Sequence, residues 1–286
     1  MGLFDDLDSQ TPEKRETIMR APFGYPGGKS RSLEFILPHL PVRGVWVEVF
    51  GGSGVITLNR PRSKLEVFND RFSGVTAFYK CMRDPNLYSK LCDWLDLSLH
   101  SREEFLFNRD TWESVQDPVE RAGRWFAMVN YSFSQLGRNW GRSTSSNTSL
   151  SGKVRNKIKD LPEIHARFRT IQVENSSWEN VLRDYDAIDT VFYLDPPYID
   201  AYAGTYVHEM SKEDHLKMIE IIFSLKGFVA VSGFANPIYD NRPWDKRFDW
   251  EVYSSMMPQV EETNNHSNMD RTKVQECLWI KEAQFK

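Results

Sequence analysis

One segment near the start of the chain limits its possible folds more than any other. A short apolar strand at 45–50 runs directly into the turn Gly51-Gly52-Ser53-Gly54, and a helix begins at Val55. This order is typical of the first strand–turn–helix unit of a nucleotide-binding α/β sheet. Because the turn lacks the GxGxxG spacing of dinucleotide sites, we expect a smaller adenosine-bearing ligand.

Two further features belong with this unit. The next predicted strand, 64–68, ends at Asn69 and Asp70, and an acid at that tip lies where such folds bind ribose hydroxyls. Upstream, the glycine-rich loop 23–30 carries Lys29 and precedes a predicted helix. Its glycines allow close backbone approach to a ligand, although the GxxxxGK spacing of a P-loop is absent. Alone, this loop is equally typical of an ordinary helix entry.

A second apolar strand, 190–194, is followed by Asp195-Pro196-Pro197-Tyr198. Ligands of open α/β sheets bind at the carboxyl ends of strands, which is where this acid and ring are expected. The prolines cannot continue a central strand and fix their backbone, so neighbouring carbonyls point in a set direction. A carboxylate, a fixed carbonyl and a ring can hold a planar group that bears an NH₂. The alternative is an ordinary proline turn.

The spacing of apolar residues predicts the remaining elements. Helices are expected at 72–82, 86–99, 119–133 and 154–168, and the strand–helix alternation is broken between 101 and 170. The alternation returns with a strand at 170–174, a helix ending at Leu182, a helix starting at Ser211 and a strand at 228–233. Two last strands, near 252–253 and 274–280, are expected to pair antiparallel at the sheet edge.

The interrupting segment is basic, although the whole chain has a net charge of −4. Between Arg138 and Arg169 there are eight Lys or Arg residues and two acidic ones. Such a local excess is typical of a face that follows phosphates, and an ordinary solvated helix surface is the alternative. Arg and Asn side chains can read base edges and Lys can contact phosphates, so the candidate DNA-binding residues are Arg138, Asn139, Arg142, Lys153, Arg155 and Lys157.

Size and composition exclude several classes of protein. The chain has 286 residues, enough for one large α/β domain with an insertion. No apolar run reaches the length of a membrane span, and no signal peptide opens the chain. Three scattered cysteines argue against a disulfide framework and favour a cytoplasmic location. The histidines show no zinc-ligand spacing, so no metal is expected.

Together these segments resemble a known family. The order Gly24–Lys29, Glu48–Gly54, Asn69–Asp70 and Phe192–Tyr198 is similar to that of DNA adenine N6-methyltransferases of the Dam type, in the alpha group of amino-methyltransferases. The resemblance covers roughly residues 22–281 and includes phage-borne members. It implies a Rossmann-like α/β methyltransferase sheet with helices on both faces. The implied catalytic domain is 22–84 with 169–286, the target-recognition insert is 85–168 and mainly helical, and 1–21 is an acidic tail.

The resemblance also implies S-adenosylmethionine as cofactor and double-stranded DNA as partner. The catalytic residues implied by position are Asp195, Pro196, Pro197 and Tyr198. The cofactor-binding residues so implied are Tyr25, Gly27, Gly28, Lys29, Glu48, Phe50, Gly51, Gly52, Gly54, Asp70, Ser177 and Asp195. Many relatives have an Asp before the aromatic that follows the 170–174 strand, whereas this chain has Ser177 before Trp178. A serine hydroxyl can accept a hydrogen bond from the cofactor adenine but carries no charge.

The expected activity is methyl transfer to a flipped adenine. Asp195 and the carbonyl of Pro196 would accept the two amine protons, and Tyr198 would stack on the base. Two alternatives stay open: a non-catalytic DNA-binding protein on the same scaffold, and methylation of another amine, such as cytosine N4, an RNA adenine or a protein amide. The sequence also leaves open the recognition site, the oligomeric state, and whether the enzyme is solitary or paired with a restriction nuclease.

Overall fold

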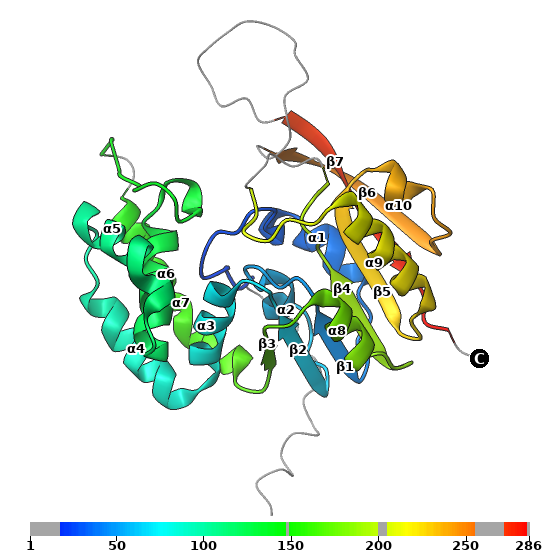
Figure 1. Ribbon diagram of the computed structural model, residues 1–286, viewed down its shortest axis with the longest axis horizontal. Coiled ribbons are helices and arrows are strands. Elements are labelled where there is room, and N and C mark those ends of the chain that lie inside the picture. The colour runs from blue at the N-terminus through cyan, green and yellow to red at the C-terminus, as the bar shows by residue number, and fades with distance from the viewer. Residues whose placement is uncertain (1–17, 147–148, 200–204, 255–271, 285–286) are drawn as a thin grey trace, which may run out of the picture.

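The computed structural model describes residues 18–146, 149–199, 205–254 and 272–284. Within these residues, seven strands form one sheet in the order β3-β2-β1-β4-β5-β7-β6 (Figure 1). The first five strands are parallel, whereas β7 runs antiparallel to both β5 and β6. The strands are β1 Val45–Glu48, β2 Leu65–Asn69, β3 Gln172–Glu174, β4 Thr190–Leu194, β5 Phe228–Phe234, β6 Lys246–Ser254 and β7 Thr272–Lys281.

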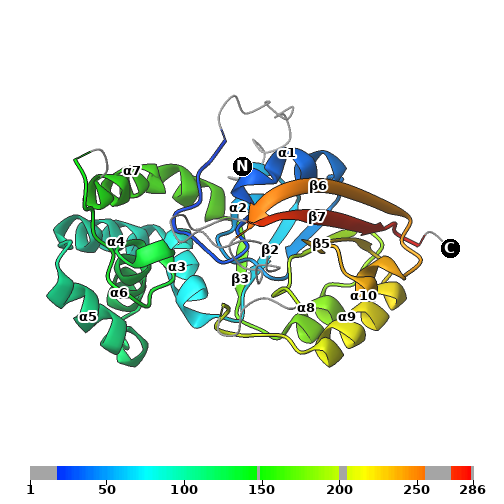
Figure 2. The same ribbon diagram turned by 90° about the horizontal axis from the view of Figure 1, so that it is seen from above.

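Helices cover both faces of the sheet, because the central strands are apolar on both sides. Trp46 and Tyr193 point to one face and pack with α1 (Leu33–Ile36) and α2 (Val55–Asn59). Val47 and Phe192 point to the other and pack with α8 (Trp178–Asp184) and α9 (Lys212–Ser224), near α10 (Pro237–Asp240) (Figure 2). The predicted Rossmann-like α/β sheet is thereby confirmed, as is the antiparallel pair at its edge.

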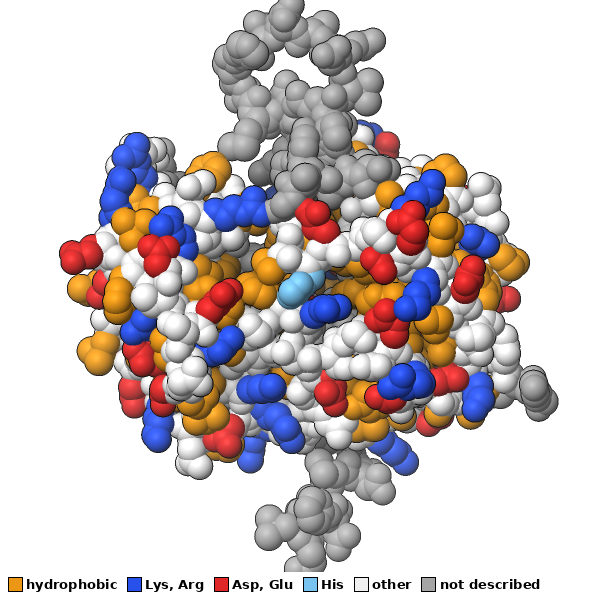
Figure 3. Space-filling view, in the orientation of Figure 1, with side chains coloured by type: hydrophobic (Ala, Val, Ile, Leu, Met, Phe, Trp, Pro, Cys, Tyr) orange, Lys and Arg blue, Asp and Glu red, His pale blue; other side chains and the backbone are white. Residues whose placement is uncertain are grey.

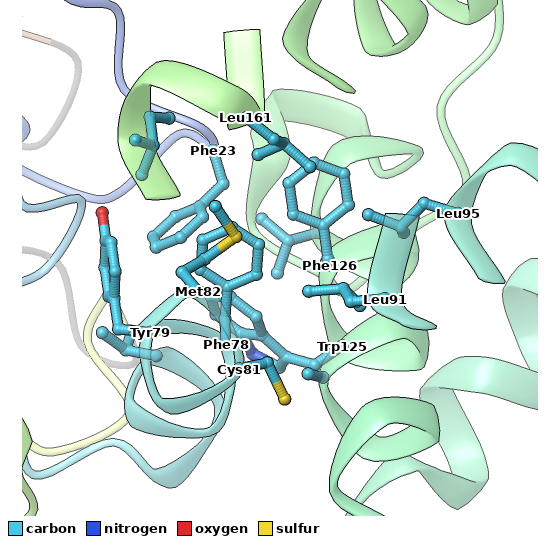
Figure 4. Close-up of a cluster of buried hydrophobic side chains, with 14 of the residues drawn as sticks. Phe23, Phe78, Tyr79, Cys81, Met82, Leu91, Leu95, Trp125, Phe126 and Leu161 are labelled. Atoms are coloured by element: carbon cyan, nitrogen blue, oxygen red, sulfur yellow. The ribbon is translucent and has the colours of Figure 1, made fainter. Parts of the chain in front are cut away.

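A helical module lies beside the β2 and β3 end of the sheet (Figure 1). It consists of α3 (Ser73–Arg83), α4 (Pro85–Leu97), α5 (Arg102–Thr111), α6 (Pro118–Asn130) and α7 (Leu150–Phe168). Its core joins Phe78, Tyr79, Trp125, Phe126 and Leu161 (Figure 4). Phe68 of β2 belongs to the same core, so module and sheet are packed as one body. Helices α4–α7 span the range expected for the recognition insert, and α3 packs against them from outside that range.

Local sequence explains why the module divides into separate helices. Side chains of Asp84, Ser101, Asp117 and Ser149 accept hydrogen bonds from backbone N–H groups at the starts of α4, α5, α6 and α7 respectively. Such caps satisfy donors that a helix start leaves unpaired. Proline stands first in α4 and α6, where its missing N–H costs nothing.

A buried ion cluster fastens α7 to the sheet. Arg167 of α7 donates to both carboxylate oxygens of Glu66 on β2, with 2.7 Å between Nη2 and Oε1. Arg60 Nη1 lies 3.2 Å from the same Oε1. Each of the three side chains is at most a few per cent exposed. A carboxylate so deep in the protein requires such partners, because an unpaired buried charge is costly.

The helix expected after the glycine loop is present, but it is short. Residues 29–39 form three short pieces: a 3₁₀ turn at Lys29–Arg31, α1, and a second 3₁₀ turn at Leu37–His39 that contains Pro38. Proline lacks the N–H that a longer helix would need there. The expected acidic tail lies outside the described residues apart from 18–21. Nowhere in the described ranges is there a helix both long and apolar enough to cross a membrane.

Candidate active site

The carboxyl ends of β1, β2 and β4 open onto a cleft. Ligands of open α/β sheets bind at this end of the strands. Among the residues proposed from the sequence, those that line the cleft are Tyr25, Gly28, Lys29, Glu48, Phe50, Gly51, Gly52, Asp70, Asp195 and Pro197. Gly27, Gly54, Ser177, Pro196 and Tyr198 are not part of its lining, and Pro196 and Tyr198 line a second, smaller pocket together with Pro197. The topology therefore brings segments from four distant parts of the chain to one place.

The glycine turn after β1 is shaped by its contact with Asp70. Gly52 has φ +50° and its N–H donates to Asp70 Oδ2 at 2.7 Å. A Cβ on Gly52 would meet the Tyr25 ring at 2.8 Å, so both the backbone angle and the close approach require glycine. Phe72 N–H donates to Asp70 Oδ1, also at 2.7 Å. Burial raises the pKa of Asp70 to about 6, against the lowering effect of these two hydrogen bonds.

Glu48 ends β1 at the floor of the cleft. Its side chain is buried, and Oε2 accepts a hydrogen bond from the N–H of Thr57 at 3.2 Å. Burial raises the pKa of Glu48 to about 8, more than the hydrogen bonds from Thr57 lower it. At neutral pH the carboxyl is therefore mostly protonated, and a cation beside it would favour its charged form.

Lys29 and Asp195 meet at the centre of the site. Lys29 Nζ lies 2.5 Å from Oδ1 and 2.6 Å from Oδ2 of Asp195, and 2.9 Å from the Gly27 carbonyl oxygen. Burial alone would lower the pKa of Lys29, but the carboxylates of Asp195 and Glu276 raise it overall. Burial and Glu276 raise the pKa of Asp195, although Lys29 opposes them. Burial is therefore the main reason why the pKa of Asp195 is raised, whereas the two nearby carboxylates are the reason why the pKa of Lys29 is raised.

Tyr198 lies on the other side of this ion pair. Its hydroxyl contacts Lys29 Nζ and donates to Glu276 Oε1 at 3.1 Å. The ring lies against Phe234 of β5, with 4.3 Å between ring centroids, and Lys29 Nζ is 4.8 Å from its centroid. The aromatic ring of the Asp-Pro-Pro-Tyr segment is thus fixed by contacts at both its edge and its face.

Sequence reasoning missed two polar side chains that hold this centre. Ser232 of β5 donates to Asp195 Oδ1 at 3.0 Å and pairs with the Tyr193 hydroxyl at 2.7 Å. Glu276 of β7 is 4% exposed and is 3.2 Å from Lys29 Nζ. The available signal was an acid next to the apolar run 277–280, because charged residues are rarely buried without a partner.

Ser177 caps the start of helix α8. As the residue before α8, its hydroxyl accepts from the N–H of Asn180 at 3.4 Å. The cleft is instead lined nearby by Ser176, Trp178 and Glu179. Glu179 is paired with Lys217, with 3.2 Å between Oε1 and Nζ. A contact from Ser177 to a bound adenine stays a prediction.

The proposed DNA-binding residues divide by exposure. Arg138, Asn139, Arg142, Lys153 and Arg155 are exposed on the helical module. Arg155 pairs with Asp96, at 3.2 Å between Nη1 and Oδ1. Figure 3 shows lysine and arginine side chains gathered at the upper end of this module, at the left of the view.

Lys157 differs from the other five. Its half-buried Nζ donates to Asn130 Oδ1 at 2.7 Å and to Gln135 Oε1 at 2.5 Å. Gln135 Oε1 also accepts the N–H of Gly24 at 2.7 Å, and Gln135 has φ +57°. The ammonium thus holds a strained turn of the module against the glycine loop.

No group of three or more His, Cys, Asp and Glu side chains in the described ranges could hold a metal ion.

Comparison with known proteins decides the class of enzyme. Residues 25–265 match the model of a family described as D12 class N6 adenine-specific DNA methyltransferase. The chain belongs to this family. The methyltransferase is therefore an enzyme that methylates adenine in DNA, as the order of its motifs predicts, and the alternative of a non-enzymatic scaffold is not supported.

Other comparisons add little to this assignment. No curated protein matches the methyltransferase. One similar solved structure is described as a conserved hypothetical protein of Streptococcus pyogenes, at 10% identity and a TM-score of 0.32. The match covers 88% of this chain and 94% of that one.

Proposed function

We propose that the methyl donor is S-adenosylmethionine, bound in the cleft between the glycine turn and Asp195. The observation that carries this proposal is the convergence of Glu48, Gly52, Asp70 and Asp195 on one cleft. The cofactor has a ribose with two hydroxyls, an ammonium and a sulfonium, and buried carboxylates are the groups that hold such charges and donors. The residues present therefore fit this cofactor.

Each end of the cofactor has a candidate partner. Asp70, which is already held by two backbone N–H groups, would accept the ribose hydroxyls. Glu48 would pair with the ammonium, because this buried carboxyl lies on the cleft floor and needs a cation to ionise. Tyr25 and Phe50 line the same cleft and offer apolar walls to the cofactor.

The target adenine is proposed to bind outside the duplex against Asp195, Pro196 and Tyr198. Unpairing and unstacking a base costs a few kcal/mol, and stacking on an aromatic ring returns about 1–3 kcal/mol. The Asp195 carboxylate and the Pro196 carbonyl would accept the two protons of the exocyclic amine. That interaction localises the nitrogen lone pair, which is otherwise conjugated into the ring.

The reaction then needs positioning more than it needs acid–base power. When bound, S-adenosylmethionine supplies an electrophilic methyl group on a sulfonium that leaves as a neutral thioether. The amine nitrogen would form the new N–C bond as the S–C bond breaks. The Asp195 carboxylate would hydrogen-bond the amine proton and then accept it from the methylated nitrogen, and no covalent enzyme intermediate is required.

Recognition of the DNA site is proposed to reside in residues 85–168. The catalytic part would then be 22–84 with 169–286. Exposed side chains on the module can reach a duplex, with Arg138, Asn139 and Arg142 as candidates for base edges and Lys153 and Arg155 for phosphates.

The test is direct transfer of label. Purified protein is incubated with S-adenosylmethionine tritiated in the methyl group and with plasmid DNA from cells that lack adenine methylation. We expect label in DNA, and N6-methyladenine in its nucleoside digest, with the Asp195→Ala protein as the control that gives none. Absence of label with the intact protein, or label in cytosine, would contradict the proposal.

A further inference from the structure

The Asp195 carboxylate, which is the proposed acceptor of the amine protons, is already paired with Lys29. Lys29 Nζ is within 2.6 Å of both oxygens of Asp195, and Ser232 donates to one of them. A carboxylate has about four acceptor positions, so a target amine must compete with these donors. For Asp195 to take an amine proton well, the ammonium must withdraw from at least one oxygen.

A second carboxylate lies ready to receive that ammonium. Glu276 Oε1 is 3.2 Å from Lys29 Nζ and accepts the Tyr198 hydroxyl at 3.1 Å. Its other oxygen, Oε2, accepts the Ser32 hydroxyl at 2.6 Å and the Trp250 indole N–H at 3.0 Å. The carboxylate is thus fixed from behind by neutral donors, and the oxygen that faces the site is shared by Lys29 and Tyr198.

The arrangement of charges favours a Lys29 ammonium that can move from Asp195 to Glu276 over one that stays paired with Asp195. One ammonium lies between the buried carboxylate of Glu276 and the half-buried carboxylate of Asp195, and Lys29 is only 3% exposed. A move toward Glu276 keeps the ammonium paired throughout, which matters because an unpaired buried charge is costly. The contact distance to Glu276, 3.2 Å against 2.5 Å to Asp195, leaves room for that move.

We propose that Glu276 is a positioning residue that takes up the Lys29 ammonium when the target amine reaches Asp195. It also anchors the hydroxyl of Tyr198, so that the ring keeps its place while Lys29 moves. This inference rests on the proposed binding of the target amine at Asp195. Glu276 acts through Lys29 and Tyr198 and has no direct role toward the methyl group.

The test is Glu276→Gln, which preserves shape and removes charge. The amide oxygen can still accept from Ser32 and Trp250, while the NH₂ faces Lys29 and cannot pair with it. With Glu276 neutral, Lys29 stays on Asp195. We expect the single-turnover rate of methyl transfer to fall by about tenfold or more, at saturating cofactor and DNA. Dissociation constants for S-adenosylmethionine and DNA should stay within about twofold, a split that a merely structural role would not give.

Two controls separate charge from packing. Ser32→Ala removes one hydrogen bond to Glu276 but leaves its charge, and should change the rate less than about threefold. Glu251→Gln removes an exposed carboxylate on neighbouring β6 that pairs with Lys273 at 2.6 Å, and should leave the rate unchanged. A loss in Ser32→Ala as large as in Glu276→Gln would overturn the proposal in favour of a packing role.

A double-mutant cycle with Lys29→Met gives the decisive comparison. Without an ammonium to move, Glu276→Gln should cost little, so Lys29→Met and the double variant should transfer methyl at similar rates. The same fold loss in both backgrounds would refute the exchange, as would an unchanged rate in Glu276→Gln alone. If Glu276→Gln fails to fold, the comparison of Lys29→Met with the double variant still decides. A wild-type protein that takes no methyl from S-adenosylmethionine would instead count against the proposed function.

Discussion

Asp70 accepts the N–H of Gly52 at 2.7 Å, which joins the tip of the second strand to the turn after the first. Its pKa is raised to about 6 by burial, so the carboxyl is protonated in mild acid. We predict that S-adenosylmethionine affinity increases as pH rises through about 6, because only the carboxylate accepts both ribose hydroxyls. Calorimetric titration between pH 5 and pH 7 measures this.

Asp70→Asn is the matched variant for that titration. It should bind the cofactor weakly and show no increase in affinity across this pH range. An Asn variant with the same pH profile as the wild type would assign the titration to another group.

The raised pKa of Glu48 leads us to predict that cofactor binding releases a proton. Burial holds its pKa at about 8, so at pH 7 the free enzyme carries a mostly protonated Glu48. A cofactor ammonium beside it favours the charged form, so binding should release up to about one proton. The measurement is the binding enthalpy at pH 7 in buffers of different ionisation enthalpy, whose slope gives the protons released. Glu48→Gln should abolish the slope, and equal slopes in both proteins would exclude Glu48 as the source.

Substitutions should distinguish the role of Asp195 from that of Tyr198. Asp195→Ala is expected to abolish methyl transfer while DNA binding survives, because the acceptor is lost but the recognition surface is not. Tyr198→Phe keeps a ring against Phe234 and should retain much of the activity, whereas Tyr198→Ala should retain little. Single-turnover rates and a gel-shift assay measure these outcomes. Equal losses in the two Tyr198 variants would indicate that the hydroxyl matters more than stacking.

How much of this site follows from sequence depends on where each residue stands in its strand. Asp70 and Asp195 end parallel strands, and such ends meet at one edge, so their convergence could be predicted from strand order alone. Glu276 lies inside β7, where it pairs in register with Phe234 of β5 and Trp250 of β6. That register decides which face a side chain takes, and a slip of one residue would reverse it.

A count of charged residues in the sequence likewise does not show which of them are exposed. Lys157 contributes to the basic excess between Arg138 and Arg169. Its actual surroundings depend on Asn130 at the end of α6 and on Gln135 in a turn of positive φ. Neither contact is local in sequence, and non-glycine residues rarely take such φ values. Composition could therefore identify a basic module but could not identify which ammonium groups reach its surface.

Substitution of Arg167 is expected to lower the free energy of unfolding, although this residue is not part of the candidate active site. Arg167→Met leaves the buried Glu66 with weaker partners, namely Arg60 and the Ser63 N–H at 3.2 Å and the exposed Arg62 at 4.0 Å. Removing one member of a buried ion pair costs about 3 kcal/mol. Urea unfolding of purified protein measures the free energy lost. Arg183→Met is the control, since its pair with Asp184 is exposed and should contribute at most about 1 kcal/mol. Similar losses in the two variants would contradict a structural role for the buried cluster.

Lys153 and Lys157 offer a matched pair of lysines on α7 for testing the DNA face. Lys153 is exposed, whereas Lys157 Nζ is held by Asn130 and Gln135, and burial lowers the pKa of Lys157 to about 8. If Lys153 contacts a phosphate, Lys153→Met should lower the slope of log affinity against log salt by about 1. Lys157→Met should leave that slope unchanged and lower thermal stability, because it releases Gln135 and the Gly24 N–H that it accepts. Filter-binding titrations from low to moderate salt give both slopes, and a reduced slope for Lys157→Met would show that this ammonium reaches the DNA.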